Sequence, residues 1–140
     1  MAITCRRMAS GDEALVTKIA QDVFDGPIDR GQLETYLASP GHLMVLAFEA
    51  DLVVGQCMAI VHHNPCKANE LYIDELGTSS HHLRQGIATK MLHEIFAWAR
   101  EMNCTEAWLA TELENLAANR LYEKLGALKD TVRSYQFDLR

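Results

Sequence analysis

Residues Leu71 to Thr89, LYIDELGTSSHHLRQGIAT, join a strand pattern to a polar loop and the start of a helix. The first turn of a helix presents unpaired backbone N–H groups and the positive end of the helix dipole, so this position favours an anion. Gly86 lets the backbone approach a ligand closely, and Arg84 adds positive charge. The alternative is that Gly86 only eases the turn into the helix. Neither the phosphate-loop lysine motif nor G-x-G-x-x-G is present.

The elements that would position this segment follow from hydrophobic periodicity and capping signals. Strands are predicted over residues 2–6, 43–48, 52–61, 70–76, 106–110, 127–130 and 133–139. Helices are predicted from Ser10 toward Phe24, over 32–37 and 86–101, and from a capping box at Thr111 and Glu114 to Gly126. The order β-α-α-β-β-β-α-β-α-β-β predicts an α/β (α+β) fold, with a mixed, strongly twisted β-sheet flanked by helices.

Composition narrows the class of protein. A chain of 140 residues with 49% hydrophobic residues predicts a single domain over residues 1–140. The net charge of −6 argues against nucleic-acid binding and suits cationic partners. The four cysteines form no C-x-x-C pair, and no signal peptide or membrane span is evident, so we expect a cytoplasmic protein with reduced thiols. His62, His63 and Cys66 lack a fourth ligand, so we predict no metal site.

Two sequence blocks together resemble the GNAT (Gcn5-related N-acetyltransferase) superfamily. LGTSSHHLRQGIAT resembles its acetyl-CoA signature, a strand end followed by Arg/Gln-x-x-Gly-x-Gly/Ala. Asn115-x-x-Ala118-x-x-Leu121-Tyr122, ending at Gly126, resembles its later helix motif. The spacing of the blocks agrees as well, so the resemblance covers essentially the whole chain. It departs from the family at Leu83, where Arg or Gln is usual, at Thr78 and at Ala127.

The resemblance implies acetyl-CoA as the co-substrate, bound where the strand ends. The pantetheine arm would pair with backbone at the strand end, the pyrophosphate would lie over the loop and helix start, and Asn115 would touch the arm. The implied cofactor-binding residues are Leu76, Gly77, Thr78, Leu83, Arg84, Gln85, Gly86, Ile87, Ala88, Thr89, Asn115 and Tyr122. Tyr122 would protonate the departing thiolate as general acid, and its alternative is a packing role.

An amine acceptor also needs a base, because an amine with a pKa near 10 is protonated at neutral pH. Glu70, Asp74 and Glu75 are the candidates on the same strand, and we favour Glu75 as base or water relay. Strand alternation would place Glu75 with Leu71 and Ile73, but we expect a β-bulge where this strand splays, and a bulge would change that count. The alternative is that Asp74 and Glu75 only bind a cationic substrate or make structural bonds.

Within the superfamily the chain most resembles aminoglycoside 3-N-acetyltransferases. The residues that carry this resemblance are Thr4-Cys5-Arg6, Glu75 in place of an aspartate, His82-x-Arg84-Gln85-Gly86, Leu121-Tyr122 and Phe137-Asp138. The stretch from Val23 to Arg30, where acceptor specificity lies in that group, is shorter here. Other acceptors are a polyamine or a peptide or protein amine, and a non-catalytic acyl-CoA-binding module is the alternative class. A homodimer is a further expectation from the resemblance.

Overall fold

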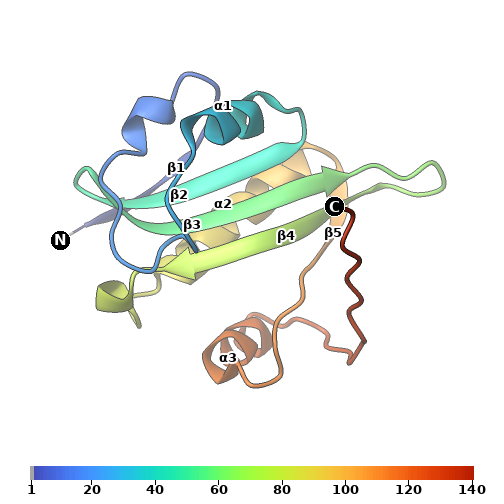
Figure 1. Cartoon of the computed structure of the whole chain (residues 1–140). Helices are drawn as coiled ribbons and strands as arrows, with labels where there is room; N and C mark the ends of the chain where they lie inside the picture. Colours follow the sequence, from blue (N-terminus) through green and yellow to red (C-terminus); the bar gives the residue numbers. More distant parts are fainter. Residues whose placement is uncertain (1) are drawn as a thin grey trace. The chain divides into compact units, whose positions relative to one another are not determined.

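A computed structural model describes residues 2–140, and the chain divides into two compact units, residues 1–109 and 110–140. The first unit contains five strands: β1 (Ile3–Arg7), β2 (His42–Glu49), β3 (Leu52–His62), β4 (Asn69–Thr78) and β5 (Cys104–Trp108). They form one sheet in the order β1-β2-β3-β4-β5, in which β1 to β4 run antiparallel and β5 runs parallel to β4 (Figure 1). The predicted mixed sheet is therefore confirmed.

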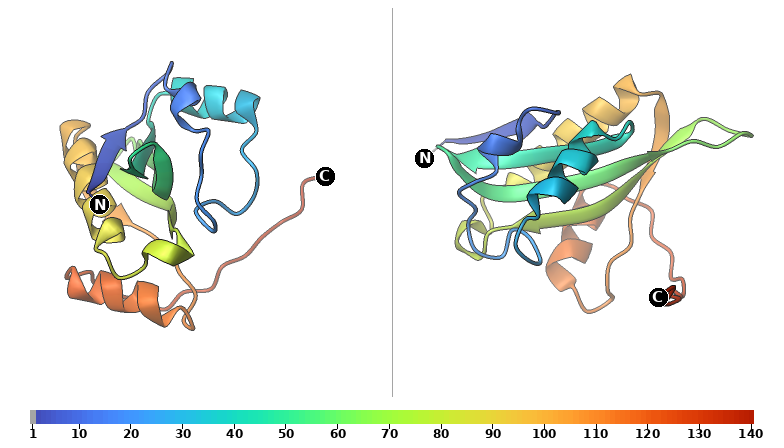
Figure 2. Two further views of the ribbon diagram at one scale, coloured as in Figure 1. Left: turned by 90° about the vertical axis from the view of Figure 1, so that its left-hand side faces the viewer. Right: turned by 45° about the horizontal axis from the view of Figure 1, so that its top comes forward.

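Helices cover both faces of this sheet (Figure 2). On one face lies α2 (Ile87–Glu101), and its Met91 side chain approaches Gly55 so closely that a Cβ there would lie 2.8 Å from the methionine methyl group. On the other face lie the single turn η1 (Glu13–Leu15) and α1 (Arg30–Ala38), whose Leu33 belongs to the same buried cluster as Met44. The predicted helices 32–37 and 86–101 are thus confirmed within a few residues.

The predicted helix from Ser10 toward Phe24 is wrong. Only η1 is helical there, and the chain then runs extended beside β3, where Val53 donates to the Lys18 carbonyl and accepts from the Ala20 N–H. Carboxylates of Asp12 and Glu13 accept hydrogen bonds from the backbone just before the turn, which fixes a tight local structure instead of a helix start. The β-branched residues that follow favour an extended chain.

A β-bulge in β4 decides which carboxylates share a face. Met58 of β3 pairs with Glu75, whereas Ala59 pairs with Ile73, so Asp74 is the extra residue. Because residues 58 and 60 point to the same face and pair with Glu75 and Tyr72, Glu75 lies on the α1 face of the sheet, opposite Ile73. The bulge expected from the sequence is present, and it reverses the simple alternation.

The strands β4 and β5 separate after a short parallel ladder. Their pairing runs from Asn69 with Cys104 to Tyr72 with Trp108 and stops there. From Ile73 to Thr78 this edge of β4 therefore has no strand partner among residues 2–140. Backbone groups along such an edge can bind an extended ligand.

The second unit contains α3 (Leu116–Lys124) and an extended C-terminal segment. Asn115, not Thr111, caps α3, because its side chain accepts the Ala118 N–H at 3.2 Å. Gly126 has φ +87° and ends the helix as predicted, with the Ala127 N–H bonded to the Tyr122 carbonyl. The predicted strands 127–130 and 133–139 are wrong: no residue of either segment lies in a strand.

Candidate active site

The loop between β4 and α2 leads from a strand into the first turn of a helix, as the sequence predicts. After β4, Ser79 is fully buried and its hydroxyl accepts the His81 N–H. Arg84 and Gly86 both adopt left-handed backbone conformations, with φ of +62° and +74°. For a non-glycine residue this conformation is uncommon and is concentrated at binding sites. Gly86, the N-cap residue of α2, makes no side-chain cap hydrogen bond, so the first N–H groups of α2 face out of the helix end without a cap from it.

The predicted cofactor residues of the first unit fit acetyl-CoA on two observations. Leu76, Gly77 and Thr78 lie on the part of β4 that has no neighbouring strand on the β5 side. The residues Leu83 to Thr89 form the loop and the uncapped start of α2. Leu83, the departure from the family signature, is 59% exposed, so its side chain lies at the surface and not in the core.

Glu75 is the predicted base that the structure places beside a cavity. A cavity of about 370 Å³ opens on the α1 face of the sheet and is lined by Glu75 together with Tyr36, Met44 and Met58. Asp25 and Asp29, from the segment before α1, line the same cavity. Three carboxylates around an otherwise largely apolar cavity can attract and orient a cationic ligand.

The surroundings of Glu75 favour its protonated form more than water does. Partial burial raises the pKa of the Glu75 carboxyl, and the negative charges of Asp25 and Asp74 raise it further. A hydrogen bond from Gln56 acts in the opposite direction. A carboxyl whose pKa is moved toward neutrality is suited to accept and release a proton.

The other two candidate bases have different surroundings. Glu70 lies at the far end of β4, forms an ion pair with Lys67, and this hydrogen bond lowers the pKa of its carboxyl. Asp74 is exposed at the bulge and does not line the cavity. Glu75 alone of the three lines the cavity, and a low pKa makes Glu70 a poor base.

Sequence reasoning missed several residues around this site. Tyr36 donates a hydrogen bond to the Leu43 carbonyl at 2.7 Å, and burial raises the pKa of its phenol, so it stays neutral. Gln56 is 2% exposed and touches both Glu75 and the backbone of Val23. Asp25 and Asp29 lie in the stretch Val23 to Arg30, where the family resemblance places acceptor specificity without naming these residues. The available signal was the acceptor specificity that the resemblance assigns to this stretch.

Asn115 and Tyr122 belong to the second unit. Asn115 is exposed and uses its side-chain oxygen as the cap of α3. Tyr122 lies seven residues later in the same helix and is partly buried. Their predicted contacts with acetyl-CoA stay predictions.

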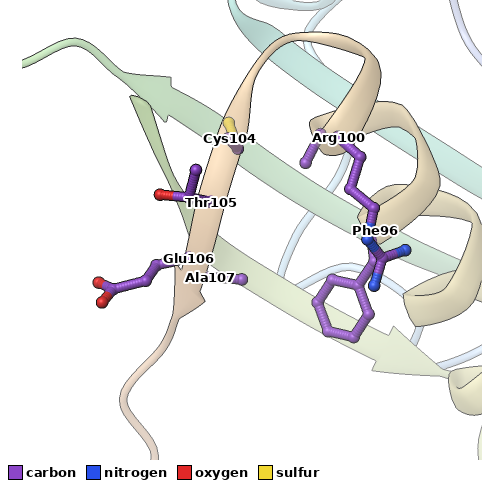
Figure 3. Close-up of a pocket in the computed structure, with 7 residues that line it drawn as sticks. Phe96, Arg100, Cys104, Thr105, Glu106 and Ala107 are labelled. Atoms are coloured by element: carbon purple, nitrogen blue, oxygen red, sulfur yellow. The ribbon is translucent and has the colours of Figure 1, made fainter. Parts of the chain in front are cut away.

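A second cavity, of about 200 Å³, lies between α2 and β5 (Figure 3). Phe96 and Arg100 of α2 line one side, Cys104 and Ala107 of β5 line the other, and Glu106 points away from α2. Within residues 2–140, no group of three or more His, Cys, Asp or Glu side chains could hold a metal ion, here or elsewhere.

The comparisons with known proteins agree with this geometry. The model of the acetyltransferase (GNAT) family matches residues 14–127, and the chain belongs to that family. It is accordingly an N-acetyltransferase, and the family uses acetyl-CoA. No helix within residues 2–140 has the length and apolar character needed to cross a membrane.

The individual relatives share 30% sequence identity or less with this chain. An aminoglycoside N(6′)-acetyltransferase type 1 of Serratia marcescens is 28% identical over 102 residues, covering 69% of this chain and 70% of that protein. Human N-acetyltransferase 8 is 30% identical over 103 residues, which are 73% of this chain and 45% of the human protein. A solved aminoglycoside acetyltransferase from an uncultured soil metagenomic sample superposes with a TM-score of 0.83 at 19% identity, with both chains fully covered. The solved structure shows that the fold is shared. The Serratia relative agrees with the class of enzyme that the sequence resembles, although it is named for the 6′-amine, not the 3-amine.

Proposed function

We propose that this N-acetyltransferase moves the acetyl group of acetyl-CoA to a primary amine of a cationic acceptor, with Glu75 as the base. The observation that carries the proposal is the position of Glu75, which lines a cavity with Asp25 and Asp29 and lies three residues before the end of β4. The unpartnered edge of β4 and the uncapped start of α2 support acetyl-CoA binding on the same strand. The cavity and the thioester would then meet at one strand.

The proposed chemistry is direct transfer. The acceptor ammonium gives a proton to the Glu75 carboxylate, directly or through water, and the free amine nitrogen attacks the thioester carbonyl carbon. A C–N bond forms, the C–S bond breaks, and the sulfur leaves as a thiolate that takes a proton. We propose Tyr122 as the donor of that proton, on the strength of the family motif that begins at Asn115. As the amide forms, the nitrogen loses its second proton, which restores the Tyr122 hydroxyl, and the proton held by Glu75 is released to solvent.

For the acceptor we propose an aminoglycoside. Several amines on one molecule match the three carboxylates around the cavity and the net charge of −6. The aminoglycoside acetyltransferases among the relatives support the same class, and we assign no position on the sugar. Polyamines and peptide amines are the competing acceptors. Their chains are flexible, so they would make fewer fixed contacts in a cavity of about 370 Å³.

The direct experiment measures thiol release from acetyl-CoA with aminoglycosides, polyamines and short peptides. We expect release with aminoglycosides, a loss of about 10²- to 10⁴-fold in kcat/KM for Glu75→Gln, and a clear loss for Tyr122→Phe. Tyr135→Phe is the matched control, because it removes the same hydroxyl from an exposed tyrosine in the same unit. Thiol release with only another amine class would show that the acceptor is not an aminoglycoside. Full activity of Tyr122→Phe would show that Tyr122 is not the general acid.

We also propose that the two units act together as one GNAT domain over residues 1–140 and that the protein forms a homodimer. The family match across residues 14–127 supports the first point, since it spans both units. Large apolar side chains left exposed in the second unit support the second, with Val132, Phe137 and Leu139 between 74% and 95% exposed. Light scattering of the protein eluted from a size-exclusion column tests the homodimer, and a monomer at micromolar concentration would refute it. A cytoplasmic location stays a prediction from the sequence.

A further inference from the structure

Gln56 is a polar residue at a buried position, where an apolar side chain would cost less free energy to bury. It lies in the middle of β3 with 2% of its surface exposed, on the face that carries Leu46 and Met58. Its side-chain oxygen is buried and has no hydrogen-bond partner within residues 2–140. Burying an unpaired amide oxygen is unfavourable, so the amide nitrogen must account for the choice of residue.

The amide nitrogen joins two parts of the site. It donates to Oε1 of Glu75 at 3.2 Å and to the carbonyl oxygen of Val23 at 3.3 Å. The reversed orientation of the amide would set its oxygen against a carboxylate and a carbonyl, which are both acceptors, and neither hydrogen bond would form. The contacts around Gln56 therefore fix which way its side chain points.

Gly77 makes this junction possible. It lies directly across from Gln56 in the β3–β4 ladder, and a Cβ on Gly77 would lie 2.5 Å from the Val23 carbonyl oxygen. Only a glycine lets the segment before α1 come so close to the strand. That segment carries Asp25 and Asp29, two of the carboxylates that line the cavity with Glu75.

We propose that Gln56 is a positioning residue, which holds the Glu75 carboxylate toward the acceptor cavity and ties it to the segment carrying Asp25 and Asp29. The inference rests on the proposed role of Glu75 as base. A carboxylate that rotates freely would point away from the acceptor amine part of the time. A carboxylate held by a hydrogen bond stays in the orientation that accepts the proton.

The charges around Glu75 make this hydrogen bond important. Asp25 and Asp29 face the cavity from the segment before α1, Asp74 precedes Glu75 on β4, and Tyr36 of α1 is neutral. No cation is among these neighbours, and burial together with Asp25 and Asp74 raises the pKa of Glu75. The hydrogen bond from Gln56 lowers that pKa and so keeps more of the base ionised at a given pH.

The test replaces the amide by an apolar side chain of similar size and follows Glu75 itself. In Gln56→Leu we expect the side-chain carboxyl resonance of Glu75, followed by carbon-13 NMR, to titrate about one pH unit higher than in the parent protein. The acid limb of kcat/KM against pH should move by the same amount, so that activity on the acidic side falls about tenfold at a fixed pH. Gln56→Met is the second variant if the leucine does not fold.

Cys57→Ala is the matched control. Cys57 is the next residue on β3, is fully buried, and lies on the opposite face, toward α2. It perturbs the same strand without touching Glu75, so the titration of Glu75 and the acid limb should not move. An unchanged Glu75 titration in Gln56→Leu would overturn the inference. A shifted titration in a protein that releases thiol with no amine would instead refute the proposed function.

Discussion

The close approach of Val23 to Gly77 gives a prediction whose size can be worked out from distances. In Gly77→Ala the new Cβ would lie 2.5 Å from the Val23 carbonyl oxygen and 3.2 Å from Nε2 of Gln56. Ordinary contact begins near 3.4 Å, so the carbonyl must retreat by about 0.9 Å. The hydrogen bond from Gln56 to this carbonyl is already 3.3 Å long and would be lost.

The expected change in the free energy of unfolding combines three effects. Overpacking against backbone costs about 1–3 kcal/mol, and the lost hydrogen bond costs about 1 kcal/mol. Replacing glycine restricts the unfolded chain and returns about 0.5–1 kcal/mol. Gly77→Ala should therefore be destabilised by about 2 kcal/mol, measured from urea unfolding curves with an unchanged slope.

Gly55→Ala is the matched control on the neighbouring strand. Its Cβ would also be crowded, at 2.8 Å from the terminal methyl group of Met91 and 3.0 Å from Cγ2 of Ile87, but both are side-chain atoms, and the flexible Met91 can rotate away. We expect its stability to stay within about 1 kcal/mol of the parent protein. If Gly77→Ala were as stable as Gly55→Ala, the segment before α1 would not be seated on β4 by a backbone contact, and the reasoning would fail.

Three further results are expected. Asp25→Asn removes a charge that raises the pKa of Glu75, so the acid limb of kcat/KM should move to lower pH, while the KM for a polycationic acceptor rises several-fold. Glu75→Gln should unfold at a higher denaturant concentration than the parent at pH 8. The raised pKa of Glu75 in the folded protein means that the parent loses stability as pH rises through that pKa. The difference should shrink as pH falls toward 4, below the pKa of a glutamate in the unfolded chain. Arg7→Met should lower the melting temperature by a few degrees in low salt, since Arg7 joins β1 to α2 through Glu94 at 2.7 Å and Glu101 at 2.6 Å, and by less in 1 M NaCl.

The sequence predicted the central elements because their patterns depend on near neighbours. The strands around Met44 and Met58, and the helix built on Met91, have strong periodicity and clear ends. The C-terminal end of α3 at Gly126 followed from a local rule about left-handed residues, and the hydrogen bond from Ala127 to the Tyr122 carbonyl confirms it. Capping at Thr111 failed because Asn115, four residues later, competes for the same role and its side chain reaches the Ala118 N–H.

The errors lie where tertiary contacts decide. Ser10 and Glu13 match a capping box, yet the chain beyond Leu15 pairs with Val53 of β3, a residue far away in sequence. The C-terminal residues 133–139 alternate as a strand does, but alternation only marks a segment that can pair, and a strand also needs a neighbour. The cavity was missed for the same reason, since Asp25 and Tyr36 meet Glu75 only once the sheet and α1 are packed.

The bulge at Asp74 leads to a last prediction, because it separates two adjacent carboxylates by function. Without the bulge, alternation would place Asp74 with Tyr72 on the α1 face and turn Glu75 away; the observed pairing of Met58 with Glu75 does the reverse. Asp74→Asn should therefore keep kcat/KM within about threefold of the parent, with a small acid-limb shift to lower pH because Asp74 raises the pKa of Glu75. Glu75→Gln should lose about 10²- to 10⁴-fold. The two substitutions make the same chemical change one residue apart, so a general loss of charge cannot produce the difference. If Asp74→Asn were the inactive variant and Glu75→Gln the active one, β4 would present the other carboxylate to the acceptor, and the register inferred for the site would be wrong.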